Sequence, residues 1–208
     1  MRFSRSLIAA LTITVVWFAC PASSVTAAEE RSISQGMLEA LRNGDVTSAF
    51  RQMQSLAEVN EVEAQHNLSL FYWHGIGATQ NFDEAIRWST MAAVRGHKKA
   101  VAARKIMVEG MDPQVVKKAM DWVRARLTKD AEAGDDTALM PMSTTYMPAF
   151  GDSKPVEAYF WAALSVSTGK AEARRQRDFL VSTMNQNDVI KAQQRANDWF
   201  KRWRKAQS

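Results

Sequence analysis

Residues 63–96 read EAQHNLSLFYWHGIGATQNFDEAIRWSTMAAVRG, and this stretch decides the fold that the sequence predicts. Ala64, Leu68 and Tyr72 recur every four residues, so they fall on one face of a helix. Gly75 and Gly77 then interrupt the pattern, as residues that readily adopt a positive φ angle do. The first half of the stretch therefore predicts a helix followed by a glycine turn.

The second half of the stretch predicts another helix beyond that turn. Asp83 is a residue type that caps helix N-termini, and the apolar pattern ends at Gly96. Small residues on the inner face allow two helices to pack closely, and Trp88 fills the remaining space. The residues predicted on this face are Ala85, Trp88, Ser89, Ala92 and Ala93.

This pattern resembles the Sel-1-like repeat, a relative of the tetratricopeptide repeat. Ser69 and Ser89 depart from it, since the family usually has a glycine and an aromatic residue there. The resemblance implies an all-α fold, a short right-handed solenoid of antiparallel helix pairs. Because the matching residues are packing residues, the resemblance bears on fold more than on function. They are Ala64, Leu68, Tyr72, Gly75, Gly77, Ala85, Trp88, Ala92, Ala93 and Gly96.

Weaker copies of the same spacing flank the central repeat, which predicts a solenoid over residues 28–169. Residues 45–60 read as the second helix of an earlier repeat, and residues 97–134 and 135–169 as two later repeats. Trp122 and Trp161 occupy the position of Trp88 in these later repeats. Residues 170–208 predict a pair of helices that caps the solenoid and covers its last apolar face.

The N-terminus predicts a secretory signal peptide over residues 1–27. Arg2 and Arg5 precede an apolar run at residues 7–19, and small residues follow as far as Ala27, near which we expect cleavage. An uncleaved anchor and a lipidated Cys20 are the alternatives. The sequence thus predicts an exported protein, in the periplasm of a Gram-negative bacterium or secreted, and cleavage would remove its only cysteine.

Composition agrees with a folded helical protein whose charge is unevenly placed. The chain has 208 residues, 46% of them hydrophobic, and a net charge of +5. Residues 29–169 carry fifteen basic and eighteen acidic side chains, whereas residues 170–208 carry ten and four. The basic cap, Lys201, Arg202, Arg204 and Lys205, predicts weak contact with an anionic polymer or membrane, unless it is simply a solvated surface. Export argues against a nucleic-acid partner.

Sequence motifs for chemistry are sparse, so we predict a protein that is not an enzyme and needs no cofactor or metal. His66 and His74 are eight residues apart, too far to share a metal on one helix. Met140, Met142 and Met147 suggest a soft-metal site less well than an irregular core. An envelope hydrolase remains the alternative, because cysteine-rich relatives have been linked to β-lactams.

We therefore predict an adaptor that binds a protein or peptide in the cell envelope through the concave repeat surface. Trp73 stands where such repeats usually have a small or polar residue, so it either covers a neighbouring helix or anchors the partner. Glu109 and Met147 occupy the same position in the later repeats. His66 and Ser69 are predicted to join Trp73 in a stripe off the packing face. These five residues form the predicted partner site.

Overall fold

The computed structural model describes residues 39, 42–151 and 153–207, and in this part the protein is entirely helical. The predicted signal peptide and its cleavage site lie outside the described residues. The prediction of an all-α fold is confirmed. The α-helices are α2 (Val46–Glu58), α3 (Val62–His74), α4 (Phe82–Val94), α5 (Lys98–Val108), α6 (Pro113–Glu132), α7 (Leu139–Thr144), α8 (Pro155–Ser167), α9 (Glu172–Thr183) and α10 (Gln186–Ala206).

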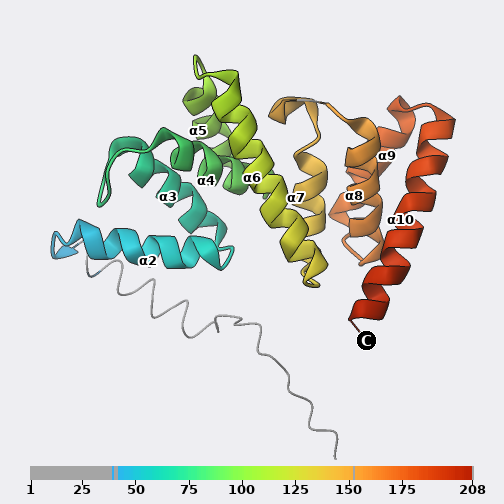
Figure 1. Ribbon diagram of the computed structural model, residues 1–208, viewed down its shortest axis with the longest axis horizontal. Helices are drawn as coiled ribbons and strands as arrows, with labels where there is room; N and C mark the ends of the chain where they lie inside the picture. Colours follow the sequence, from blue (N-terminus) through green and yellow to red (C-terminus); the bar gives the residue numbers. More distant parts are fainter. Residues whose placement is uncertain (1–38, 40–41, 152, 208) are drawn as a thin grey trace, which may run out of the picture.

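The helices follow one another in chain order along the long axis of the molecule, from α2 to α10 (Figure 1). Two short 3-10 helices, η1 (Asp136–Ala138) and η2 (Pro148–Phe150), flank α7. Within the described residues, no helix is both long and apolar enough to cross a membrane. This helical, repeat-like arrangement fits an α-solenoid in general.

Four helices end in the same way, which gives the repeat a structural basis. Asn60, Gly96, Gly134 and Gly169 all have positive φ angles, and Asn60 is the one non-glycine residue with this conformation in the described part of the chain. Each donates its N–H to a carbonyl three residues earlier, at 3.0–3.2 Å. Since glycine and asparagine adopt left-handed backbone most readily, these positions stop α2, α4, α6 and α8.

Aspartate and asparagine side chains cap the N-termini of α2, α4 and α10. Asp45, Asn81 and Asn185 accept hydrogen bonds from backbone N–H groups three residues ahead. Asn81 rather than Asp83 caps α4, so the predicted cap is wrong by two residues. Asp83 instead lies in the first turn, where a carboxylate interacts favourably with the helix dipole.

Buried alanines at the predicted spacing let the helices pack closely. Ala85 and Ala92 on α4 are completely buried, as are Ala100 on α5 and Ala158 on α8. Through such positions α4 packs against α3, α5 and α6, and α8 packs against α7, α9 and α10. α4 and α8 are therefore the central helices of two halves of the core, and α6 lies between these halves.

Tryptophans at the predicted repeat position join these halves. Trp88 is 4% exposed and meets Trp122 of α6 edge to face, with ring centroids 5.2 Å apart. Arg126 lies over both rings, at 5.7 and 5.9 Å. Trp161 on α8 is also buried, whereas Trp122 is only half-buried. The three tryptophans thus share a sequence position but differ in burial.

Candidate functional site

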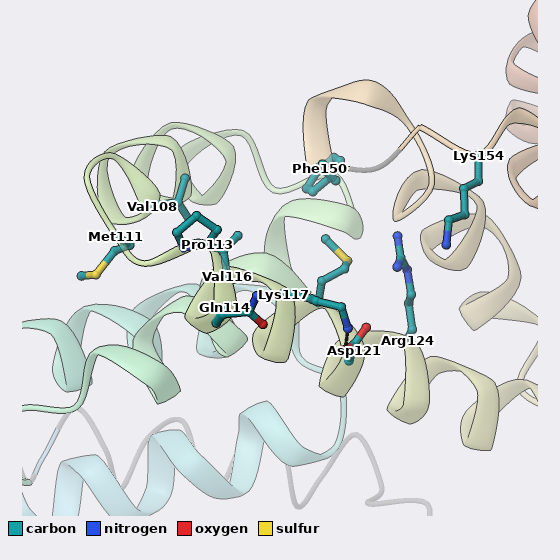
Figure 2. Close-up of a pocket in the computed structure, with 12 residues that line it drawn as sticks. Val108, Met111, Pro113, Gln114, Val116, Lys117, Asp121, Arg124, Phe150 and Lys154 are labelled. Carbon is teal, nitrogen blue, oxygen red and sulfur yellow. Dashed lines mark hydrogen bonds and ion pairs between the residues drawn. The ribbon is translucent and has the colours of Figure 1, made fainter.

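The candidate site is a groove where the α5–α6 turn and α6 face the segment after α7 (Figure 2). Its cavity volume is about 540 Å³, within the range of ligand-binding pockets in proteins. Apolar and charged side chains line it, and we call it the central groove. The lining residues are Val108, Met111, Pro113, Gln114, Val116, Lys117, Met120, Asp121, Arg124, Phe150, Gly151 and Lys154.

The central groove lies where the third repeat departs from the second. α3 and α4 pack extensively, but the backbones of α5 and α6 make few close contacts. The position of buried Leu68 is taken by Arg104, and that of Tyr72 by Val108. Valine is smaller than tyrosine and cannot fill the same space, while the Arg104 side chain contacts Thr90 and Phe150. The pair therefore stays open at the end of α5.

Arg104 is held on the packing side of α5 as a buried cation. It is 7% exposed, its Nε donates to Thr90 Oγ1 (2.9 Å), and its guanidinium lies 5.0 Å from the Phe150 ring centroid. Burial lowers the pKa of the Arg104 guanidinium, because the charged form loses hydration. The cation–π contact attaches η2, and with it Phe150, to α5.

One part of the central groove is apolar. Val108 and Met111 belong to a cluster with Met107, Ala119 and Val115, so the inner side of the α5–α6 turn is packed. Pro113 begins α6 at a position where its missing N–H costs no hydrogen bond. Figure 2 shows Val108, Met111, Pro113 and Val116 together on one side of the groove.

The other part is cationic. Arg124 Nη2 donates to the Thr145 carbonyl (2.7 Å) and Nε to Thr145 Oγ1 (3.2 Å), and its guanidinium lies 4.2 Å from the Tyr146 ring centroid. Burial raises the pKa of the Tyr146 hydroxyl, and the charge of Arg124 partly opposes this. The side chain of exposed Lys154 extends toward Arg124 from across the groove (Figure 2).

The nearby carboxylates already have other partners. Asp121 binds Lys117 at 2.6 Å, one turn back on α6. Glu157 binds Arg195 of α10 through both oxygens, and this hydrogen bonding lowers the pKa of Glu157, with a smaller contribution from Lys154. Among the described residues, therefore, no carboxylate forms an ion pair with Arg124 or Lys154.

The structure separates the three equivalent positions of the predicted partner site. Trp73 is half-buried, with its ring centroid 4.7 Å from that of Phe82, and it packs against the same buried cluster as Val108 and Met111, which line the groove. Glu109 is exposed at the end of α5. Met147 packs in a different cluster with α8 and α9 residues. Trp73 and Glu109 thus neighbour the central groove, whereas Met147 belongs elsewhere.

The prediction that His66 and Ser69 lie off the packing face is wrong. Ser69 is completely buried and its hydroxyl donates to the His66 carbonyl (2.6 Å), while His66 is 6% exposed. The His66 ring instead packs against that of His97, with centroids 4.6 Å apart, and His97 Nε2 lies 2.8 Å from Glu63 Oε2. α3 is covered on more than one side, so these residues are not available to a partner.

The basic cap lies at the exposed end of α10. Lys201, Arg202, Arg204 and Lys205 are all exposed, and Arg204 lies 6.0 Å from the Phe200 ring centroid. Trp203 anchors this end, because its Nε1 donates to the Ala131 carbonyl of α6 (2.7 Å). The cations are therefore displayed on a helix fixed to the body of the protein.

Sequence reasoning missed the central groove except for its neighbours Trp73 and Glu109. The signal that could have found it is the pair of departures at Arg104 and Val108, both visible in the sequence. No group of three or more His, Cys, Asp or Glu side chains in the described part of the chain is placed to hold a metal ion. Neither a scan against protein-family models nor a search of curated proteins gives a match.

Proposed function

We propose that this protein is a non-catalytic adaptor of the bacterial cell envelope that binds a protein or peptide partner at the central groove. In this proposal the chain is a Sel-1-like, right-handed solenoid of antiparallel helix pairs, closed by α9 and α10 and exported by its signal peptide. The partner-binding surface is the groove with its neighbours Trp73 and Glu109.

The observation that carries the proposal is the mixed lining of the central groove. Val108, Met111 and Val116 offer apolar contact, and Arg124 and Lys154 offer charge at the other side. Binding sites combine an apolar surface with a few polar groups that fix orientation. Half-buried Trp73 adds an aromatic side chain, a type enriched among residues that dominate binding energy.

Site-specific capture tests this function. The full-length chain is expressed in a Gram-negative host, and purified protein is used to retain envelope proteins, with identification by mass spectrometry. Val116→Glu places a charge in the apolar part of the groove, and Lys191→Gln alters exposed α10 as the matched control. We expect a partner retained by the wild type and the control and lost with Val116→Glu. A retained set that is identical for all three proteins contradicts the proposal.

A second candidate function rests on the basic cap. Its four exposed cations lie on a helix anchored by Trp203, so they could meet an acidic polymer or anionic membrane without unfolding α10. Such binding weakens with salt, since exposed charges are screened beyond about 8 Å at physiological ionic strength. Replacing Lys201, Arg202, Arg204 and Lys205 by glutamine should abolish retention on heparin while leaving the melting temperature nearly unchanged. Retention that survives both salt and substitution removes this candidate.

A further inference from the structure

We infer that the central groove selects an extended peptide segment that carries a bulky apolar residue and, about four residues away, an acidic residue. This inference rests on the proposed function and specifies the chemistry of the partner. It follows from the distance between the apolar and cationic sides of the groove and from the pairing of the charges around it.

The cationic side of the groove is complementary in charge to a carboxylate. Arg124 and Lys154 extend toward each other from opposite walls (Figure 2), and like charges in proximity repel. Asp121 is paired with Lys117, and both oxygens of Glu157 bind Arg195. A carboxylate brought by a ligand would therefore find two cations that no described carboxylate pairs with.

Arg124 is also positioned in advance for such a ligand. Its Nε and Nη2 are bound to Thr145, so the guanidinium is fixed beside Tyr146 and loses little freedom when an anion arrives. The exposed side chain of Lys154 is flexible, so its ammonium group can move to meet the carboxylate. The pair thus combines one fixed and one mobile cation.

The distance between the apolar and cationic sides sets the spacing of the ligand residues. Val116 and Arg124 are eight residues apart on α6, which corresponds to about 12 Å along a helix that rises 1.5 Å per residue. An extended peptide covers about 13 Å in four residues at 3.3 Å each. In an extended peptide, a leucine in contact with Val116 and a glutamate in contact with Arg124 are therefore four residues apart.

A short extended segment spans the groove with fewer residues than a helix. A helix needs eight residues to cover the distance of about 12 Å between Val116 and Arg124, whereas an extended segment needs four. An extended segment also has a smaller cross-section than a helix, which is about 10 Å across with its side chains. The two contacts therefore fit a short extended segment.

The test measures binding of defined peptides to the full-length protein by fluorescence anisotropy. The probes are Leu-Leu-Ser-Ser-Glu and its reverse, Glu-Ser-Ser-Leu-Leu, blocked at both ends and carrying a neutral dye. Matched probes have glutamine in place of glutamate. We expect one of the glutamate probes to bind at least fivefold more tightly than its glutamine counterpart, because only the glutamate probe carries a carboxylate to the two cations.

Variants locate the effect. Lys154→Gln should reduce the preference for glutamate below twofold, and Lys191→Gln should leave it unchanged. Lys154 is preferred to Arg124 for this purpose, because Arg124 holds Thr145 and its loss affects folding. Val116→Glu should weaken both probes about tenfold. Circular dichroism verifies that each variant is folded.

The outcomes separate the inference from the proposed function. Equal binding of glutamate and glutamine probes, still sensitive to Val116→Glu, overturns the acidic preference and leaves the groove a peptide site. Failure of all probes, with partner capture still lost in Val116→Glu, likewise overturns only the inference. Decanoate is titrated alongside, and tighter binding of decanoate than of either glutamate probe assigns the groove to a lipid-like carboxylate instead.

Discussion

The α3–α4 and α5–α6 pairs occupy equivalent places in the repeat pattern but differ in how closely their backbones approach. α3 and α4 lie in close contact along their length, with Leu68 fully buried between helices. In the other pair Arg104 takes the position of Leu68, and the backbones of α5 and α6 stay apart. The comparison teaches that a repeat can keep its helices and its turns while the backbones of the two helices move apart.

The two ends of α5 have different surroundings. His97 Nδ1 accepts the Ala100 N–H at 3.1 Å, and His97 also contacts Glu63 of α3. The N-terminus of α5 is therefore capped by a side chain, as that of α3 is by Glu61. At the C-terminus of α5, Met107 packs against α4 and Val108 lines the central groove.

Replacing the repeat tryptophans should reveal the largest difference in stability between the two helix pairs. Trp88→Ala removes a buried side chain and should lower the free energy of unfolding by about 3–5 kcal/mol. Trp122→Ala, at the equivalent but half-buried position, should cost about 1–2 kcal/mol, in line with its smaller buried area. Urea denaturation of both variants measures the difference. Equal losses would mean that the two positions are packed alike.

The turns of the two pairs should differ in their tolerance of a methyl group. A Cβ at Gly77 would lie 2.5 Å from the Val46 carbonyl oxygen and 2.6 Å from Phe50 Cβ, whereas Gly110 has open space. Both have positive φ angles, so alanine costs about 1–2 kcal/mol at either. The collision should add about 1–3 kcal/mol at Gly77 alone. Thermal melts of the two alanine variants compare them, and similar melting temperatures would contradict the close approach of α2.

Acidification should lower the free energy of unfolding by a smaller amount, through His66 and Glu63 on α3. Burial lowers the pKa of His66 from 6.5, with a further contribution from His97, and the hydrogen bond to His97 lowers the pKa of Glu63 from 4.5. A folded-state pKa below the unfolded value means that the unfolded state binds protons more readily. Stability should therefore fall below about pH 6.5 through His66 and further below about pH 4.5 through Glu63.

The measurement is the urea midpoint at pH 7.5 and pH 5.0. Two further groups act on the pKa of His66, which Glu63 raises and Lys99 lowers. His66→Leu should reduce the loss of stability between the two pH values, and His74→Leu, at an exposed position, is the control. An unchanged pH dependence in His66→Leu would show that His66 is protonated equally in both states.

Local sequence signals predicted the helices well, because helix limits depend on neighbouring residues. Asp45 and Asn185 cap α2 and α10 as their residue types suggest. Asn60 was recognisable from spacing alone, and its positive φ angle matches the repeat glycines.

The surface was harder to predict, because it depends on which sides of a helix its neighbours cover. His66 and Ser69 are polar, yet α3 is covered so completely that both are buried. On α10 two neighbouring apolar residues differ in the same way, since Ile190 is 43% exposed whereas Val189 is buried. The central groove depends on η2 and α6 lying opposite each other, a tertiary relation that no local pattern contains.

The central claim is that the central groove, where the α5–α6 turn and α6 face the segment after α7, is a peptide-binding site, and methionine methyl NMR tests it most directly. Met111 and Met120 line the groove, whereas Met53 lies in the core near α2 and Met184 near α9. Titration with the tighter-binding glutamate probe should shift the methyl signals of Met111 and Met120 and leave those of Met53 and Met184 in place. Shifts confined to Met53 or Met184 would contradict the account.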